Sequence, residues 1–237
     1  MPAHDEEAYL APAVREVAAG LRSRGRPFEI VVVENGSTDA TERVARELTA
    51  EVPELRVLTL DRADYGGALR EGFLASEGEM VGIFDVDYYD LDFLDRALDV
   101  VGAPNGPAIV VASKRGEGAV DTRAWSRRLV TSVFATVLRL GFGLQVSDTH
   151  GMKVLRRAPL VELARVSRFG TDLFDTELIL RAQRAGLTTR EIPVTVEETR
   201  PSRTSILRRI PRSVGGLVRL RLALWREGAT ASRSRTG

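Results

Sequence analysis

In the first half of the chain, apolar segments with the composition of β-strands alternate with segments that have helical spacing. This alternation limits the possible folds more than any other feature of the sequence. The runs are too apolar for strands that face solvent on one side, so they suit a parallel sheet buried on both faces. Segments with helical spacing separate them, which predicts an α/β fold with a mostly parallel central sheet and helices on both faces. The expected strands are Phe28–Val33, Leu55–Leu60, Met80–Phe84 and Ala108–Ala112.

Each of the first three predicted strands ends in a polar stretch: Glu34–Asp39, Asp61–Gly67 and Asp85–Asp90. Parallel strands present their carboxyl ends at one edge of the sheet, where ligands bind in such folds. No G-x-G-x-x-G follows the first strand and no G-x-x-x-x-G-K-[ST] occurs, so the dinucleotide and P-loop types of site are excluded. A nucleotide site of another kind fits the pattern.

Asp85 and Asp87 stand one residue apart directly after a predicted strand. Residues i and i+2 of an extended segment project to the same side, so the two carboxylates are expected to converge. Mg²⁺ or Mn²⁺ takes one or two protein carboxylates and completes its shell with water and phosphate oxygens. The alternative is an acidic turn that caps a helix at Leu91–Val101.

The composition sets outer limits. The chain has 237 residues, 43% of them hydrophobic and 28% charged, which suits one large domain or a domain with an appendage. It has no cysteine and two histidines, which excludes thiolate sites and argues against imidazole-rich zinc sites. No run of about 20 apolar residues is present, and the acidic start is unlike a secretory signal.

The net charge of +1 hides an asymmetry, because residues 200–237 carry ten arginines and one acid, leaving −8 on the rest. Such a basic tail suggests an anionic partner, although a solvated arginine-rich face is the simpler interpretation. Arginines flank an apolar stripe in the segment Ile206–Trp225, as in helices at anionic bilayers. The alternative is a core-packing helix with arginines that extend to solvent.

Four short motifs follow one another between Pro2 and Asp87. They read P-A-H-D-E-E from Pro2, V-E-N-G-S-T-D from Val33, Y-G-G-A-L-R-E-G from Tyr65, and D-V-D from Asp85. Their order and spacing resemble those of family 2 glycosyltransferases, with P-A-x-N-E-E, V-D-D-G-S-T-D, K-G-x-A-L-x-x-G and a metal-binding D-x-D. The resemblance implies a GT-A fold, that of nucleotide-diphospho-sugar transferases.

The second half continues the resemblance. The segments are A-S-K-R from Ala112, S-R-R from Ser126, V-S-D-T-H-G-M-K-V-L-R-R from Val146, F-D-T-E-L from Phe174, and R-T-S from Arg203. This series is similar to that of polyprenyl-phosphate sugar transferases, the dolichyl-phosphate glucose and mannose synthases among them.

The resemblance implies an inverting, metal-dependent transfer of a hexose from UDP-glucose or GDP-mannose to a polyprenyl phosphate. The expected cofactor is Mg²⁺ or Mn²⁺, and the expected location is the cytoplasm, peripheral on the inner face of the cell membrane. A nucleic-acid partner is not expected, because the arginines lie beside apolar residues rather than aromatic ones. The alternatives are a soluble hydroxyl acceptor, or a weakly active module that binds sugar nucleotides.

The resemblance also assigns roles to residues. Asp87 and Asp148 are the expected catalytic residues, and Asp85 and Asp87 the metal ligands. Residues expected at the nucleotide are Pro2, Ala3, His4, Glu6, Glu34, Asp61 and Asp85. Those expected at the phosphate or acceptor are Lys114, Arg127, Arg203 and Ser205, and those at the sugar are Asp175 and Glu177.

Several of these roles have simpler alternatives. Asp148 is a general base if the acceptor is a hydroxyl, but a phosphate acceptor is already an anion, and Asp148 then orients basic residues or the donor sugar. It also suits the cap of a short turn. Glu34, Asp175 and Glu177 also suit the first turns of helices, although the strand-end position favours ligand contact for Glu34.

The chain departs from the family at three motif positions and in its opening. Glu34 and Asn35 replace an Asp pair, Asp64 and Tyr65 replace Gly-Lys, and Met152 replaces Phe. The family also has a buried strand before P-A, so the sheet is expected to lack its first strand, with a start upstream of Met1 as one explanation. The expected divisions are a catalytic domain at 1–199, a basic helical segment at 200–226, and a disordered tail at 227–237.

Overall fold

The computed structural model describes residues 1–113, 120–121, 136, 138–144, 146, 149, 151–168, 170, 173–196 and 215–226. Five residues expected at the active site lie outside these ranges: Lys114, Arg127, Asp148, Arg203 and Ser205. The predicted disordered tail at 227–237 and the predicted boundary at residue 200 also lie outside the described residues.

Strands and helices alternate through the first half, as predicted. The elements in order are β1 (Pro2–Ala3), α1 (Leu10–Ser23), β2 (Ile30–Asn35), α2 (Thr41–Leu48), β3 (Leu55–Leu60), α3 (Tyr65–Ala75), β4 (Met80–Ile83), α4 (Leu91–Gly102) and β5 (Ile109–Ser113). The second half adds β6 (Val120–Asp121), β7 (Lys153–Arg156), α6 (Arg157–Val166), α7 (Phe174–Arg184), β8 (Thr189–Pro193) and β9 (Thr195–Val196). A further helix covers 215–226.

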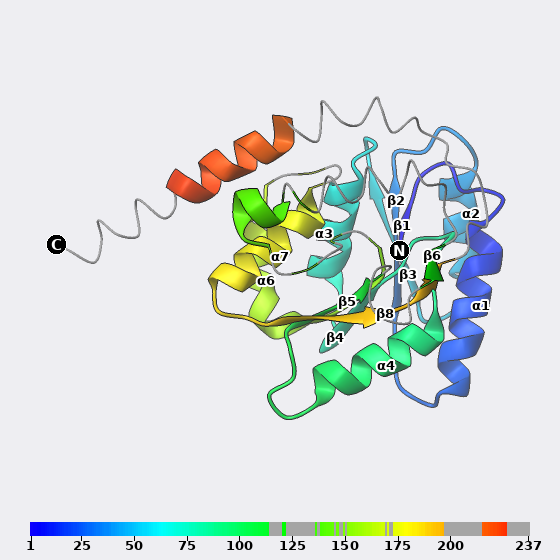
Figure 1. The fold of residues 1–237 in the computed structure, drawn as a ribbon. Helices are drawn as coiled ribbons and strands as arrows, with labels where there is room; N and C mark the ends of the chain where they lie inside the picture. Colours follow the sequence, from blue (N-terminus) through cyan, green and yellow to red (C-terminus); the bar gives the residue numbers. More distant parts are fainter. Residues whose placement is uncertain are drawn as a thin grey trace.

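Two main sheets lie at the centre of the molecule (Figure 1). One has the order β1-β2-β3 and is parallel throughout. The other has the order β4-β7-β5-β8, in which β7 is antiparallel to both neighbours while β5 and β8 are parallel. The short strands β6 and β9 form a separate parallel pair. The expectation of a mostly parallel arrangement therefore holds for the first half, and β7 makes the second sheet mixed.

Pro2 and Ala3, the start of the first motif, form strand β1. They pair in parallel with Val33 and Glu34 at the end of β2. Among the described residues, Ile30–Val32 have no strand partner on that edge of β2, and the expected loss of the family's first strand stays a prediction. The two sheets are consequently not joined by described strand pairing.

Helix α1 begins at Leu10, and Asp5 lies in the loop that precedes it. Asp5 adopts a positive φ of 53°, which a helix does not allow, and its carboxylate accepts a hydrogen bond from Thr38 N instead of capping α1. The opening segment therefore forms a loop that contacts the end of β2 rather than a helical turn.

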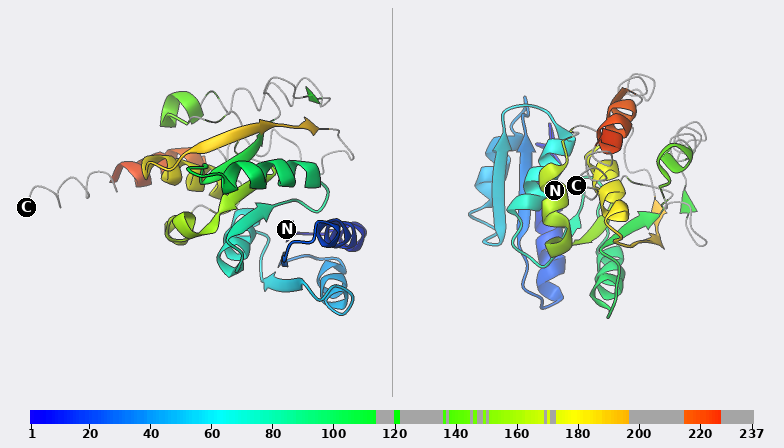
Figure 2. Two further views of the ribbon diagram at one scale, coloured as in Figure 1. Left: turned by 90° about the horizontal axis from the view of Figure 1, so that it is seen from below. Right: turned by 90° about the vertical axis from the view of Figure 1, so that its left-hand side faces the viewer.

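Helices cover both faces of the sheets, as predicted (Figures 1 and 2). Helices α1 and α4 lie on one side, and α3, α6 and α7 on the other. Each face has its own buried cluster: Phe73, Leu155 and Leu178 belong to the one under α3, α6 and α7, and Phe93 and Val110 belong to the one under α4. Burial of these side chains fixes the positions of the strand ends.

The helix at 215–226 packs its inner face on the α7 side of the molecule. Leu217, Leu220 and Leu224 are buried in the same cluster as Phe174. Its outer face exposes Val218, Leu222 and Trp225. The buried face fits the core-packing interpretation of this segment, and the interpretation as a membrane-interface helix stays a prediction. Within the described residues, no helix combines the length and the apolar character needed to cross a bilayer.

Candidate active site

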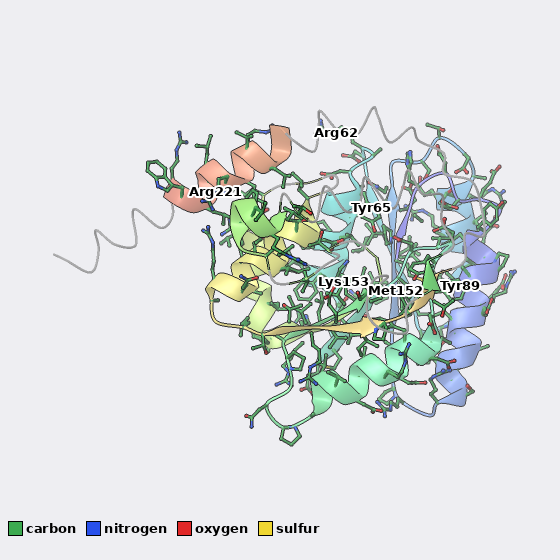
Figure 3. All side chains as sticks on the ribbon, viewed as in Figure 1. Arg62, Tyr65, Tyr89, Met152, Lys153 and Arg221 are labelled. Atoms are coloured by element: carbon green, nitrogen blue, oxygen red, sulfur yellow. The ribbon has the colours of Figure 1, made fainter. Side chains whose placement is uncertain are left out.

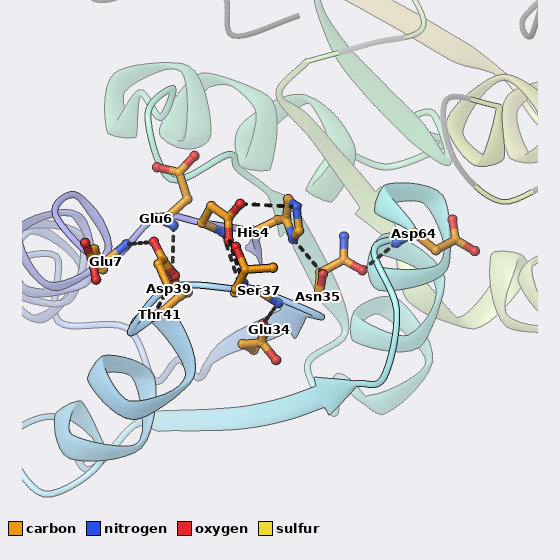
Figure 4. Close-up of polar contacts among 11 residues, drawn as sticks. His4, Glu6, Glu7, Glu34, Asn35, Ser37, Asp39, Thr41 and Asp64 are labelled. Carbon is orange, nitrogen blue, oxygen red and sulfur yellow. Dashed lines mark hydrogen bonds and ion pairs between the residues drawn. The ribbon is translucent and has the colours of Figure 1, made fainter.

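The loop after β1 and the loop after β2 are locked together by side-chain hydrogen bonds (Figure 4). Asp5 N donates to Ser37 Oγ over 3.1 Å, and Thr38 N donates back to Asp5 Oδ1 over 2.7 Å. Glu6 N donates to Thr41 Oγ1 over 2.7 Å. The hydrogen bond from Thr38 N lowers the pKa of Asp5 below its usual value. The two motifs that flank the predicted nucleotide position therefore form one rigid unit.

Asn35 joins this unit to the loop after β3. Its buried side chain accepts a hydrogen bond from Asp64 N over 2.7 Å, and its backbone oxygen lies 2.9 Å from His4 Nδ1. Gly36 follows with a φ of +62°, and a Cβ there would lie 2.8 Å from the carbonyl carbon of Arg62. Only glycine allows this close approach of the two loops.

Glu34 is buried, whereas an acid that contacts a ligand is expected to be accessible. It is 2% exposed, and its Oε1 accepts a hydrogen bond from Ser37 N over 2.6 Å. The carboxylate thus shapes the turn after β2. Its contact with the base or ribose stays a prediction, as do those of Pro2 and Ala3, which are buried, and of His4, which is exposed.

Asp85 occupies the centre of the candidate site. Its Oδ1 accepts a hydrogen bond from Tyr65 OH over 2.8 Å, and Figure 3 shows Tyr65 beneath the loops on α3. Burial raises the pKa of Asp85, with Asp87 and Asp175 adding to the rise while Tyr65 and Lys153 oppose it. Burial and the same acids hold the pKa of Tyr65 well above its usual value, so the phenol remains a donor.

The two carboxylates do not converge through extended geometry, which corrects the prediction from spacing. Strand β4 ends at Ile83, and Asp85 and Tyr88 close a turn through reciprocal backbone hydrogen bonds of 3.2 and 3.3 Å. Asp85 therefore points into the protein, whereas Asp87, at the tip of the turn, is exposed. Asp90 supplies the helix cap: its Oδ1 accepts from Asp92 N and Phe93 N at the start of α4.

A buried ion pair between Lys153 and Asp175 lies close enough to Asp85 to affect its ionisation. Lys153 Nζ lies 2.9 Å from Asp175 Oδ2, with side chains 1% and 3% exposed. Lys153 projects from β7 in the middle of the molecule (Figure 3), and its Nζ donates to Gly151 O over 2.8 Å. The ammonium group is near enough to Asp85 to lower that carboxyl's pKa against the effect of burial. Asp175, expected at the sugar, thus faces the carboxylate cluster from α7.

The cluster suits a divalent cation held by two carboxylates. Burial disfavours ionisation of Asp85, and the neighbouring Asp87 and Asp175 add to this effect, which a bound cation would relieve. Among the described residues no group of three or more acids or histidines has the geometry of a complete metal site. Mg²⁺ and Mn²⁺ need no such group, because water and substrate phosphates fill most of their positions. Binding of such an ion by Asp85 and Asp87 stays a prediction.

Glu177 lies on α7, and Asp61 lies in the loop after β3. Glu177 is fully buried: its Oε1 accepts from Arg181 Nε over 2.8 Å and its Oε2 from Arg168 N over 2.9 Å. Its contact with a sugar stays a prediction, and the observed geometry gives it an internal role. Asp61 is exposed and lines a hollow of about 820 Å³ between the loop after β3 and the segment after α6.

Three residues of this centre were not predicted as site residues. The sequence analysis notes Tyr65 and Asn35 only as replacements at motif positions, and it includes Lys153 only within a motif. The available signals were a charged residue inside the apolar run M-K-V-L, and an amide beside Gly36 at a strand end. Neither signal identifies the residue that Asn35 or Lys153 contacts, because Asp64 and Asp175 belong to elements distant in the sequence.

The family model of glycosyl transferase family 2 matches residues 1–163, which include β1, the loops after β2 and β3, and the turn with Asp85. The chain belongs to glycosyl transferase family 2. It is therefore a glycosyltransferase, and the motif resemblance seen in the sequence is confirmed.

Characterised and uncharacterised relatives extend the comparison. The chain is 30% identical over 194 residues to an uncharacterized glycosyltransferase of Mycobacterium tuberculosis, covering 82% of each chain. It is 30% identical over 210 residues to a dolichyl-phosphate beta-glucosyltransferase of Drosophila melanogaster, covering 82% of this chain and 64% of that one. It is also 28% identical to glycosyltransferase AglD of Haloferax volcanii, of which it spans 34% while 89% of this chain is covered.

Solved structures confirm the GT-A fold. Glucosyl-3-phosphoglycerate synthase from Mycobacterium tuberculosis, in complex with Mn²⁺, UDP-glucose and phosphoglyceric acid, superposes with a TM-score of 0.70 at 21% identity, covering 93% of this chain and 77% of that one. The mannosyltransferase PcManGT from Pyrobaculum calidifontis, in complex with GDP-Man and Mn²⁺, gives a TM-score of 0.56 at 24% identity, covering 89% and 59%.

Proposed function

We propose that this protein transfers a hexose, with inversion, from a nucleoside diphosphate sugar to a polyprenyl phosphate, with Mg²⁺ or Mn²⁺ as cofactor. The observation that carries the proposal is the meeting of Asp85, Tyr65 and the Lys153–Asp175 pair at the strand ends of a family 2 glycosyltransferase. Relatives named dolichyl-phosphate beta-glucosyltransferases support the acceptor, and solved structures holding UDP-glucose or GDP-Man with Mn²⁺ support the donor and the metal.

The reaction places charge on the departing diphosphate. A divalent ion on Asp85 and Asp87 supplies Lewis-acid neutralisation of that charge when bound. Tyr65 keeps Asp85 in position through its hydrogen bond, and the Lys153–Asp175 pair sets the local field. Lys114, Arg127, Arg203 and Ser205 remain proposed contacts of the phosphates or acceptor. Asp175 and Glu177 remain proposed for the sugar side.

The proposed nucleotide position is the rigid unit formed by the loops after β1, β2 and β3. His4 is exposed beside Asn35, and Glu6 is partly exposed on the same unit. Pro2, Ala3 and Glu34 are the buried residues of this unit that we expected at the nucleotide. Asp61 borders it through the loop that Asn35 holds. The hydrogen bonds within the unit reduce the entropy lost when a nucleotide binds.

A lipid acceptor requires the enzyme to reach a membrane surface. The exposed stripe of Val218, Leu222 and Trp225 lies on a helix that also carries three arginines, at 219, 221 and 226. Arginine-flanked apolar stripes favour the interface of an anionic bilayer. The proposal includes peripheral association of the protein with the cytoplasmic face of the membrane. It also includes a boundary at residue 200 between the catalytic domain and the basic helical segment.

A soluble acceptor is the second candidate. It is favoured by the fold neighbours named glucosyl- and mannosyl-3-phosphoglycerate synthases. Asp148 then serves as the general base for a hydroxyl acceptor, a role that a phosphate acceptor does not need. A module that binds sugar nucleotides without turnover is the third outcome that the experiment distinguishes.

The test incubates purified protein and Mn²⁺ with UDP-glucose or GDP-mannose, crossed with a polyprenyl phosphate or 3-phosphoglycerate, and detects products by mass spectrometry. The proposal predicts a glycolipid from one donor and none with Asp87→Asn. Asp99→Asn is the matched control, because Asp99 is exposed on α4 outside the site. Product on 3-phosphoglycerate alone would establish the soluble acceptor, and donor binding without any product would establish the binding module.

A further inference from the structure

The hollow of about 820 Å³ lies where α3 begins and α6 ends. Its walls are the loop after β3, the first turns of α3 and the segment that follows α6. Of the residues proposed above for the nucleotide and the metal, all of which the structure describes, only Asp61 lines it. Its volume is in the range of small-molecule sites, so the hollow is a candidate binding site in its own right.

The lining of the hollow contains four arginines: Arg62, Arg70, Arg165 and Arg168. Two of them are ion-paired. Arg70 Nη1 lies 2.5 Å from Glu71 Oε1, and Arg165 Nη1 lies 2.6 Å from Glu162 Oε1. Arg70 Nε also donates to Ala164 O over 3.1 Å, which joins α3 to the end of α6. These two arginines therefore hold the walls of the hollow together.

The other two arginines, Arg62 and Arg168, are exposed, and within the described part of the chain neither guanidinium has an ion pair or a hydrogen bond. Their backbones are nevertheless fixed. Arg168 N donates to Glu177 Oε2 over 2.9 Å. The carbonyl carbon of Arg62 would lie 2.8 Å from a Cβ on Gly36, so its loop is packed closely against the loop after β2. Two unpaired guanidiniums thus extend from two different walls, each of them held in place.

Asp64 separates the hollow from the proposed nucleotide position. Its backbone N faces Asn35, whereas its carboxylate points the other way (Figure 4). Asp64 Oδ1 accepts a hydrogen bond from Gly67 N over 3.0 Å at the start of α3. A Cβ on Gly170 would lie 2.4 Å from Asp64 Oδ2, so this carboxylate is enclosed where the two walls meet. Asp61 is the acid of the lining that remains exposed.

The chemistry of the two unpaired side chains indicates the kind of ligand. A guanidinium presents a fork of N–H donors that matches two oxygens of a phosphate or a carboxylate. A carboxylate has two oxygens, enough for one fork. A phosphate monoester has three terminal oxygens and about two negative charges near neutral pH, so it can engage a fork from each wall. Arg62 and Arg168 together therefore favour a phosphate monoester.

We propose that the hollow binds a phosphate monoester between Arg62 and Arg168, as a second ligand site beside the proposed nucleotide position. A free small molecule and a lipid head group can both present this phosphate. Once bound, it connects the loop after β3 to the segment after α6. The inference goes beyond the donor and acceptor proposed above and does not depend on them.

Isothermal titration calorimetry of the full chain with glycerol 3-phosphate tests the site. The parent protein is expected to bind one ligand, and Arg62→Ala and Arg168→Ala are each expected to weaken binding at least about tenfold. Arg62→Lys should recover part of the loss, because it restores the charge without the fork. Asp61→Asn should strengthen binding up to about fivefold, since it removes a like charge. Arg26→Ala is the matched control, because Arg26 is exposed in the loop before β2.

Vesicles that contain phosphatidic acid identify the source of the phosphate, with phosphatidylglycerol as the phosphodiester control. If these vesicles bind and glycerol 3-phosphate does not, with the same loss in Arg62→Ala and Arg168→Ala, the ligand is a lipid head group and the site is supported. Binding of neither probe, or equal binding by the parent protein and both alanine variants, would overturn the proposal.

The sugar nucleotides provide the last comparison, because they also carry phosphates. The titration with glycerol 3-phosphate is repeated in the presence of UDP-glucose and of GDP-mannose. Unchanged binding is the expected result. Competition by either donor would assign the hollow to the donor site and overturn the proposal. Transferase activity is not used as a readout, so a failure of the proposed function leaves this test unaffected.

Discussion

Lys153 and Asp175 place opposite charges 2.9 Å apart in the interior. Lys153→Met leaves the Asp175 carboxylate buried without its partner, so we expect a loss of about 3–5 kcal/mol in the free energy of unfolding. The double variant Lys153→Met, Asp175→Leu removes both charges and is expected to recover most of that loss. Urea denaturation of the two variants measures both effects. A loss below about 1 kcal/mol for Lys153→Met would show that the pair is solvated and contradict the burial described above.

The amino group of Met1 makes stability depend on pH. Its pKa falls from 8.0 to about 6 on folding, so the unfolded chain binds more protons between these values and stability rises with pH across that window. We expect a gain of about 2–3 kcal/mol between pH 6 and pH 8 in protein that retains Met1. Chemical denaturation at several pH values measures it.

Acetylation of the amino group is the control for this prediction. It removes the titrating charge and keeps an N–H that can donate to Val31 O. The acetylated protein should therefore lose the slope between pH 6 and pH 8, and the raised pKa of Asp85 cannot account for the difference because both proteins contain Asp85. An unchanged slope after acetylation would mean that the amino group is not buried.

Single residues were predictable from the sequence where the motif itself carries the chemistry. Asp85 and Asp87 were identified because carboxylates after a strand suit a metal. Their geometry was predicted incorrectly, since the turn from Asp85 to Tyr88 replaces the extended conformation that spacing implies. Asn35 and Lys153 could not be assigned, because their partners Asp64 and Asp175 become neighbours only through tertiary packing.

Helix α4 begins directly after the acidic turn, and Asp90 is its cap. Asp90→Ala removes an acceptor for two backbone N–H groups, so we expect a loss of about 1 kcal/mol in stability. Asp90→Asn keeps an acceptor oxygen and should retain both stability and activity. Asp87→Asn should keep stability and lose at least about 100-fold in activity, since a direct ligand matters more than a supporting one.

Thermal unfolding and the transferase assay together measure these three variants. The variants separate two roles within one acidic stretch. Asp90 stabilises helix α4, whereas Asp87 takes part in the reaction. Equal loss of activity in Asp90→Asn and Asp87→Asn would contradict this assignment and place the whole stretch in the site.

Elements of the first half were predictable because their apolar runs and polar ends are regular. Strand β7 was not, because its four residues K-V-L-R include a lysine and an arginine that hide the strand pattern. Its insertion between β4 and β5 in antiparallel orientation depends on pairing over long distances in sequence. Such pairing has no local signal, so the sequence predicted a single, mostly parallel sheet without an antiparallel β7.

Among the described residues, the helix at 215–226 carries an exposed apolar stripe of Val218, Leu222 and Trp225. Trp225 is 68% exposed, and its burial in a bilayer interface would contribute to binding. We expect Trp225→Ala to weaken binding to vesicles that contain phosphatidylglycerol by at least about fivefold, and salt to weaken it further. Vesicle sedimentation measures the effect.

The control is Tyr9→Ala, because Tyr9 is an aromatic residue that is 47% exposed on the opposite part of the chain. Its substitution should leave vesicle binding unchanged. If Trp225→Ala binds as well as the parent protein, or if Tyr9→Ala weakens binding to the same degree, the helix is not the membrane contact and the soluble-acceptor alternative gains support.

The central claim is that Asp85 and Asp87 hold a divalent ion beside a nucleoside diphosphate sugar. Electron paramagnetic resonance of free Mn²⁺ tests it most directly, because the signal falls as the ion binds. With UDP-glucose or GDP-mannose present, we predict that the protein removes free Mn²⁺ at one ion per chain with one of the two donors, and that Asp87→Asn does not while Asp99→Asn does. Equal Mn²⁺ uptake by the Asp87→Asn variant and the parent protein would contradict the assignment of the metal site.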